Sequence, residues 1–144
     1  MKIKKYKKKI LLITLLHLIV FIIIRLFSFS RVLKMINCFR MRSRSEISGK
    51  DIFRLATYYN KHFSESLFRT PSCLEGSLML TFILNRRGIP SEFCLGIAES
   101  GGNLTAHAWL RLNGEVLGKQ FNLDEFVQVF SSSKIDPIEV CRKF

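Results

Sequence analysis

The sequence predicts an α+β fold in which N-terminal helices precede a small antiparallel sheet. Three observations lead to this prediction. Residues 10–24 form an apolar run of helical length. Residues 72–90 carry the start and stop signals of a further helix. From residue 93 onward, large apolar residues alternate with small or polar ones, as they do in strands of a half-buried sheet.

The first third of the chain carries its whole excess of positive charge. Residues 1–50 hold thirteen Lys and Arg and one acidic residue, whereas residues 51–144 hold ten of each kind. The second part has no basic stripe and no aromatic motif for bases, which argues against nucleic acid as a partner. A polar, serine-bearing stretch at 41–49 predicts a boundary. We expect a helical segment over residues 1–45 and a domain over residues 46–144.

The basic and apolar N-terminal segment predicts association with a membrane. Six lysines precede residues 10–29, a stretch long enough to span a bilayer. Against a span, His17 and Arg25 are costly in hydrocarbon, and basic residues flank both ends. A helix that lies on an anionic membrane surface and a helix that packs on the domain are the alternatives. We expect membrane association, with the rest of the chain at the cytoplasmic face.

Cys73 stands at the start of the predicted helix. Ser72 and Glu75 have the spacing of a capping box, which makes Cys73 the first helical residue. The helix over residues 74–87 ends with two arginines, a glycine and a proline. A thiol at a helix N-terminus meets the positive end of the dipole and unpaired N–H groups, which favour the thiolate. Cys73 is therefore a candidate nucleophile, and buried packing is its alternative role.

A helix, two strands and a returning strand follow one another in the second half. Residues 93–98 and 104–112 alternate as strands, and the second of them holds His107. The Asn-Gly pair at 113–114 is a strong hairpin signal, so residues 115–121 are expected to return alongside. The tail after them fits a helix or a strand.

The two-residue turn predicts the neighbour of His107. If Leu112 pairs with Glu115, counting back along the ladder places His107 opposite Gln120, with both side chains on one face. Trp109 shares this face and either walls a site or belongs to the core. A cysteine and a histidine brought together in space are the minimum equipment for nucleophilic acyl chemistry.

This order of elements resembles that of the transglutaminase-like and papain-like cysteine enzymes. The sequence is similar to one branch in particular, the leader peptidase of lasso-peptide biosynthesis, which is the C-terminal half of the microcin-processing B protein. The matching motifs are Arg-Arg-Gly-Ile-Pro at 86–90, Leu-Gly-Ile at 95–97 and Ala-His-Ala-Trp-Leu at 106–110. The similar stretch covers roughly residues 51–119.

The resemblance implies a cysteine protease with a Cys, His, Asp triad. Such an enzyme removes the leader from a ribosomally made precursor peptide before a separate ATP-dependent cyclase ties the lasso. It would make Cys73 the nucleophile and His107 the base. It also implies a separate leader-recognition subunit, because this chain is too short to hold that domain as well. The alternatives are a transglutaminase-type acyl transferase and a non-catalytic peptide-binding scaffold of the same fold.

The third member of the triad is not evident in the sequence. Related proteins have an aspartate a few residues after the hairpin glycine, but residues 115–119 contain none. The third member orients the imidazole, so an amide can take its place. Gln120 is the first candidate, followed by Asn122, and by Asp124 if the pairing shifts. The four cysteines form no Cys-x-x-Cys pair and have no histidine at ligand spacing, so we expect neither a metal nor another cofactor.

Overall fold

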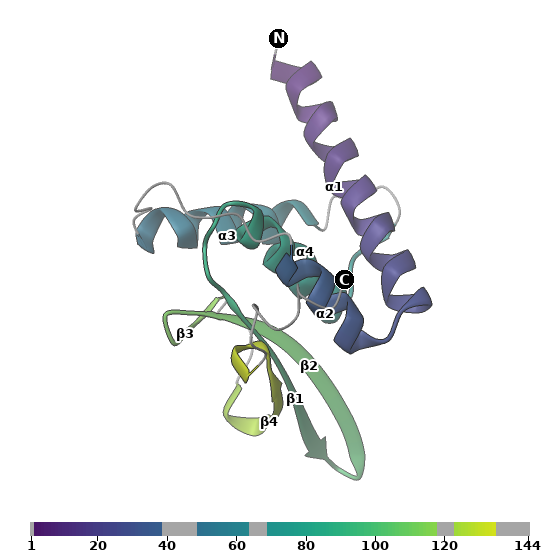
Figure 1. Cartoon of the computed structure of the whole chain (residues 1–144), viewed down its shortest axis with the longest axis vertical. Coiled ribbons are helices and arrows are strands. Elements are labelled where there is room, and N and C mark those ends of the chain that lie inside the picture. Colours follow the sequence, from purple (N-terminus) through teal and green to yellow (C-terminus); the bar gives the residue numbers. More distant parts are fainter. Residues whose placement is uncertain (1, 39–48, 64–68, 118–122, 135–144) are drawn as a thin grey trace.

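The computed structural model describes residues 2–38, 49–63, 69–117 and 123–134. In these ranges four α-helices stand over one face of a four-stranded antiparallel sheet, which confirms the predicted α+β class (Figure 1). The helices are α1 (Lys2–Leu26), α2 (Phe29–Cys38), α3 (Gly49–Phe63) and α4 (Cys73–Arg86). The strands are β1 (Glu92–Ser100), β2 (Asn103–Leu112), β3 (Glu115–Leu117) and β4 (Val127–Ser131), with the short 3-10 helices η1 (Leu123–Glu125) and η2 (Ser132–Lys134).

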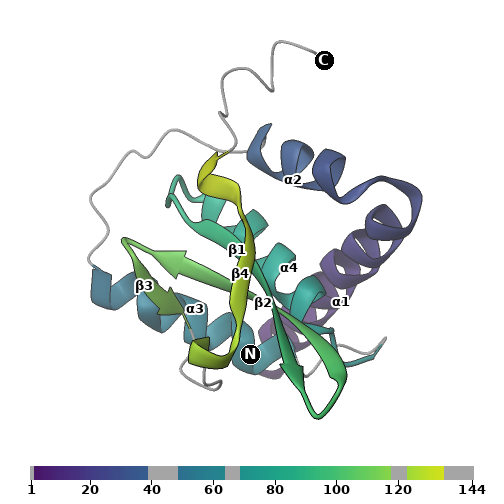
Figure 2. The same ribbon diagram turned by 90° about the horizontal axis from the view of Figure 1, so that it is seen from below.

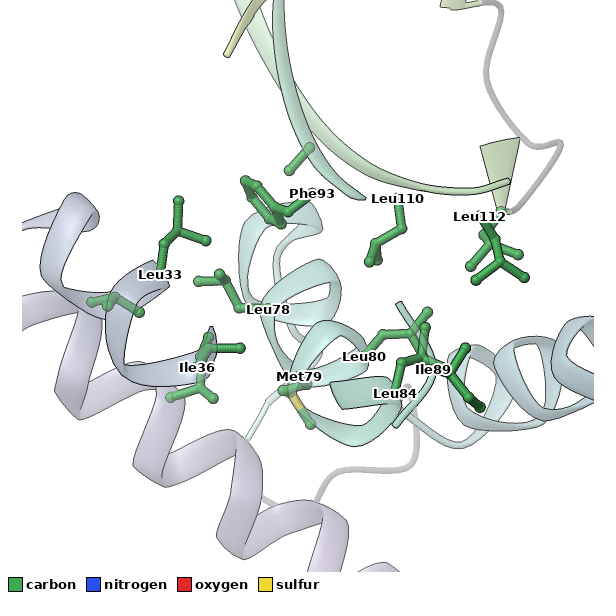
Figure 3. Packing of buried hydrophobic residues seen from close by; sticks show 14 of the residues in the cluster. Leu33, Ile36, Leu78, Met79, Leu80, Leu84, Ile89, Phe93, Leu110 and Leu112 are labelled. Carbon is green, nitrogen blue, oxygen red and sulfur yellow. The ribbon is translucent and has the colours of Figure 1, made fainter. Parts of the chain in front are cut away.

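Helix α4 lies at the centre of the molecule, between the sheet and the other helices. It is apolar on several sides, because Leu78, Met79, Leu80 and Leu84 are all buried. One side faces the sheet and another faces α2, as Figure 3 shows. A helix that is apolar all round is buried all round. The core around it includes Ile13, Val20, Val32, Leu33, Ile36, Ile52, Phe93, Ala108, Leu110 and Leu112.

Two tight hairpins build the centre of the sheet. At the turn between β2 and β3, Asn113 and Gly114 have φ values of 51° and 84°, the left-handed backbone that a two-residue turn of this kind requires. Leu112 pairs with Glu115 there, which confirms the predicted register. At the turn between β1 and β2, Gly101 and Gly102 also have positive φ. β1 therefore continues to Ser100 and β2 begins at Asn103, beyond the ranges 93–98 and 104–112 that the alternation predicts.

Of the two structures that the tail of the sequence allows, residues 127–131 adopt the strand. β4 pairs antiparallel with β1, so the order in the sheet is β3-β2-β1-β4 (Figure 2). Its register shifts between Leu95 and Gly96 of β1, where the ladder is irregular. Phe126, between η1 and β4, has its ring 5.6 Å from the imidazole of His107 in β2.

Helix α1 packs on α4 with one face and leaves the opposite face exposed. Ile13, His17 and Val20 are buried, whereas Leu11, Leu15, Leu18 and Ile22 are exposed. Among the described helices, none has the length and apolar character that a membrane crossing requires. The predicted boundary at 45 and 46 lies outside the described residues, so the division of the chain into two parts stays a prediction.

Candidate active site

Cys73 is the first residue of α4, and a complete capping box holds the helix start. Ser72 has an extended backbone (φ −65°, ψ 166°), and its hydroxyl accepts a hydrogen bond from the Glu75 N–H at 3.3 Å. In return, the Ser72 N–H donates to Oε2 of Glu75 at 2.8 Å. Cys73 is exposed and its thiol is not in a disulfide. The predicted capping box and the position of Cys73 at the start of the helix are confirmed, and the role of Cys73 as nucleophile stays a prediction.

The carboxylate of Glu75 has two further partners from elsewhere in the chain. Oε2 lies 3.4 Å from Nε2 of the buried His17 on α1, and Oε1 accepts from the guanidinium of Arg69. Burial raises the pKa of Glu75, but hydrogen bonds from Ser72 and the charge of Arg69 outweigh it. The pKa of this carboxyl is therefore held below its ordinary value, and Glu75 caps the helix as an anion.

His107 is the fifth residue of β2 and is half-buried among aromatic rings. Its imidazole lies 6.4 Å from the ring of Trp109, nearly parallel to it, and 5.6 Å from the ring of Phe126. Ala108 and Leu110 belong to the core beside α4, so His107 and Trp109 alternate to the other side of β2. Burial lowers the pKa of His107, which keeps the imidazole neutral and able to accept a proton at pH 7.

One hydrogen bond ties the helix of the thiol to the strand of the imidazole. The Ser77 hydroxyl donates to the carbonyl of Ala108 at 3.1 Å. Ser77 lies on the same helix face as Cys73, one turn or about 6 Å further on, and Ala108 directly follows His107. The structure thus brings α4 and β2 into contact, while the imidazole of His107 alternates to the side of β2 that faces away from α4. The contacts described for the two elements do not join the thiol of Cys73 directly to the imidazole of His107.

The candidates for the third member have different outcomes. Gln120 and Asn122 lie outside the described residues, so their role stays a prediction. Asp124 is exposed in η1, and Phe126, two residues later, reaches the imidazole of His107. This end of β4 therefore lies near the base, but no contact places the Asp124 carboxylate on it.

The remaining cysteines have other surroundings. Cys94 is fully buried in β1, and burial together with the Glu92 carboxylate raises the pKa of its thiol to about 11. This agrees with the packing role that its position in the strand indicates. Cys38 is exposed at the end of α2. Among the described residues, no group of three or more His, Cys, Asp or Glu side chains lies close enough together to hold a metal ion.

A polar cleft of about 380 Å³ lies at the other end of α4. Asn85 lines it from the helix, and Glu92 and Arg111 line it from the sheet. Neither Cys73 nor His107 contributes to its walls. The cleft and the candidate active site are therefore separate features of the molecule.

Sequence reasoning missed two sets of contacts at the site. The first is the pair His17 and Arg69 on Glu75, and the second is the ring of Phe126 on His107. A signal for the first existed, because a lone histidine inside an apolar helix needs a polar partner once it is buried. The contact of Phe126 has no local signal, since it depends on the pairing of β4 with β1.

Comparison with known proteins gives one match. A family model described as the transglutaminase-like superfamily matches residues 19–131, from the last third of α1 to the end of β4. Searches of the curated proteins and of the solved structures found no match. The matched range contains the thiol, the imidazole and the hydrogen bond between their elements.

Proposed function

This chain belongs to the transglutaminase-like superfamily, and on that premise we propose that it is a cysteine peptidase. The observation that carries the proposal is the accessible Cys73 at a capped helix start, on a helix hydrogen-bonded to the strand of a neutral His107. Acyl transfer from a peptide requires two groups. One is a thiol whose thiolate the helix dipole favours, and the other is an imidazole that can accept its proton.

The proposed reaction uses these groups in two steps. His107 takes the thiol proton, and the sulfur of Cys73 attacks the carbonyl carbon of the scissile peptide bond. The C–N bond breaks, and His107 returns the proton to the leaving amine. Water then loses a proton to His107 and attacks the thioester, which releases the acid and restores the thiol. The backbone N–H of Cys73, at the open end of α4, is a suitable donor to the oxyanion.

The substrate that we propose is the leader region of a lasso-peptide precursor. The support for it is the motif resemblance at 86–90 and 106–110, whereas the family match extends to the superfamily as a whole. On this proposal the chain acts with a separate leader-recognition subunit and supplies the core peptide to an ATP-dependent lasso cyclase. Orientation of the imidazole falls to Gln120, or to Asp124 if the ladder shifts.

The decisive experiment follows leader release by mass spectrometry. The purified chain is incubated with the precursor peptide and the recognition subunit, beside the variants Cys73→Ala and His107→Ala. Both variants are expected to lose cleavage, whereas Cys38→Ala, an exposed cysteine on α2, retains it. Unchanged release by Cys73→Ala would rule out the catalytic assignment. Comparing Gln120→Ala with Asp124→Ala then identifies the residue that orients the imidazole.

The same assay separates the two alternative functions. An acyl transferase forms the same thioester but gives a product cross-linked to an amine, which has a different mass from the hydrolysed product. The superfamily assignment is compatible with this chemistry. A scaffold without activity would give no product at all and would bind the precursor equally well after Cys73→Ala.

We further propose that α1 attaches the chain to the cytoplasmic face of an anionic membrane. Its outer face is apolar over several turns, with Leu11, Leu15, Leu18 and Ile22 exposed. Six lysines lie among its first eight residues, without an acidic residue among them. Apolar area and positive charge on one helix match the two properties of an anionic lipid surface, where each lysine contributes about 1 kcal/mol.

Flotation with vesicles tests this attachment. The wild-type chain should float with vesicles that contain phosphatidylglycerol and stay behind with neutral phosphatidylcholine vesicles. The double variant Leu15→Gln and Ile22→Gln should lose flotation, because it removes two side chains from the outer face. Leu104→Gln, which replaces an exposed leucine of β2, is the matched control and should float. Flotation of the double variant at the wild-type level would contradict the proposal.

A further inference from the structure

Helix α1 contacts the start of α4 through a buried polar residue. His17 is completely buried although it lies in an apolar helix, and its Nε2 is 3.4 Å from Oε2 of Glu75. The Ser72 N–H donates to that same oxygen at 2.8 Å. One carboxylate oxygen therefore joins α1 to the residue that precedes Cys73.

A second contact lies one turn further along α1. The guanidinium of Arg69 donates to Oε1 of Glu75, and it also lies 5.1 Å from the ring centre of Phe21. Phe21 and His17 are four residues apart and so lie on one side of α1. The inner side of α1 thus meets both oxygens of the capping carboxylate, directly through His17 and indirectly through Arg69.

Glu75 depends on these partners to stay in the capping position. It is buried, and a carboxylate that is removed from water needs hydrogen-bond donors or cations around it. Without His17, part of that surrounding is lost and the side chain gains by turning toward water. The Ser72 N–H would then lose its acceptor, and the first turn of α4 would fray.

The first turn of α4 is also the place where the proposed chemistry occurs. It holds the thiol of Cys73 and the N–H groups that favour the thiolate and face the oxyanion. A displacement of about 1 Å at such a centre lowers a rate by about a hundredfold. Whatever holds this turn in place therefore contributes to the rate without touching the substrate.

We propose that His17 is a positioning residue for Cys73, which makes α1 a part of the catalytic unit. His17 holds Glu75 in the capping box, and Glu75 holds the helix start that carries the thiol. This inference rests on the proposed role of Cys73 as nucleophile. His17 lies two residues before the matched range, so the family assignment does not include it.

The test measures the thiol itself, before any substrate is involved. The chain carries Cys38→Ser and Cys141→Ser, so that iodoacetamide reports Cys73. Cys94 does not interfere, because it is fully buried and its thiol pKa is about 11. At pH 7, His17→Leu is expected to slow alkylation about fivefold, the size of a helix-terminus effect of about 1 kcal/mol. In the cleavage assay kcat should fall about tenfold or more, with KM within about twofold.

A conservative variant and a matched control separate positioning from docking. His17→Gln keeps an N–H that can donate to Glu75 and should restore both rates. Val20→Ala opens a cavity on the same inner side of α1 but keeps His17, so it should lower the melting temperature and leave alkylation unchanged. His17→Asn, whose amide is too short to reach Glu75, provides the same test if His17→Leu does not fold.

Two outcomes would overturn the inference. One is wild-type alkylation by His17→Leu or His17→Asn, and the other is an equal slowing by Val20→Ala, which would make helix docking alone responsible. If His17→Leu slows alkylation but the wild-type chain cleaves no precursor, the positioning role of His17 stands and the peptidase proposal is refuted. The two proposals can therefore fail separately.

Discussion

Gly96 is the position where a single methyl group should disturb both the sheet and the base. It lies opposite His107 in the pairing of β1 with β2. A Cβ at this position would be 2.7 Å from Cη2 and 2.8 Å from Cζ3 of Trp109, and 3.1 Å from the carbonyl oxygen of Val127. Carbon atoms do not approach below 3.0 Å, so the indole or β4 must move. Trp109 is 5% exposed and has little room to do so.

The expected cost of Gly96→Ala follows from this overlap. Inserting a methyl group into a packed site costs about 1–3 kcal/mol. For a chain of this size, each kcal/mol lowers the melting temperature by about 4 °C, so a decrease of roughly 4–12 °C is expected. The indole also neighbours the imidazole of His107, so kcat in the leader-release assay should fall together with stability.

Thermal unfolding followed by circular dichroism measures the first effect, and Trp109→Phe provides the control. Phenylalanine lacks the two indole atoms that the new methyl group meets. Gly96→Ala should therefore cost less in the Trp109→Phe background than in the wild type, a coupling that a double-mutant cycle measures. A wild-type melting temperature for Gly96→Ala, or an equal cost in both backgrounds, would refute the steric reasoning.

Three further predictions concern the helix cap and the two titrating groups. Ser72→Ala should destabilise the chain by about 1 kcal/mol in urea unfolding, because the Glu75 N–H loses its acceptor, and an unchanged midpoint would contradict this. Because the pKa of Glu75 is lower in the folded chain than its unfolded value of 4.5, its ionisation stabilises the fold. This contribution is complete above pH 4.5 and is lost as the pH falls through the folded pKa. The free energy of unfolding of Glu75→Gln, measured against pH, should lack this loss. Because burial lowers the pKa of His107, kcat/KM plotted against pH should begin to fall on the acidic side only below pH 6.5. A fall with a midpoint above pH 6.5 would show that another group titrates there.

The parts of the fold that were predicted correctly are encoded over a few residues. Ser72 and Glu75 satisfy each other's backbone within one turn, so their spacing alone predicts where α4 begins. Asn113 and Gly114 tolerate positive φ, and this property determines the turn and with it the register of Leu112 and Glu115. Neither inference depends on the rest of the chain.

The parts that were left open depend on residues that are distant in the sequence. The tail with Val127 and Val129 has two local readings, and only its pairing with β1 selects the strand. Likewise, α1 is apolar enough for several environments, and the buried contact of His17 with Glu75 shows which side of it faces the protein. The partner lies fifty-eight residues further along the chain, beyond any local pattern.

The two halves of the site therefore respond to different perturbations. The thiol of Cys73 depends on its capping box and on α1, which approach it from the helical side. The imidazole of His107 depends on Trp109 and Phe126, which belong to the sheet and to the segment before β4. Replacement of His17 on α1 should slow alkylation of the thiol and leave the acidic limb of the pH profile in place. Changes at Gly96 should shift that limb and leave alkylation unchanged, because the hydrogen bond that joins α4 to β2 runs from the Ser77 hydroxyl to the Ala108 carbonyl and involves neither catalytic side chain.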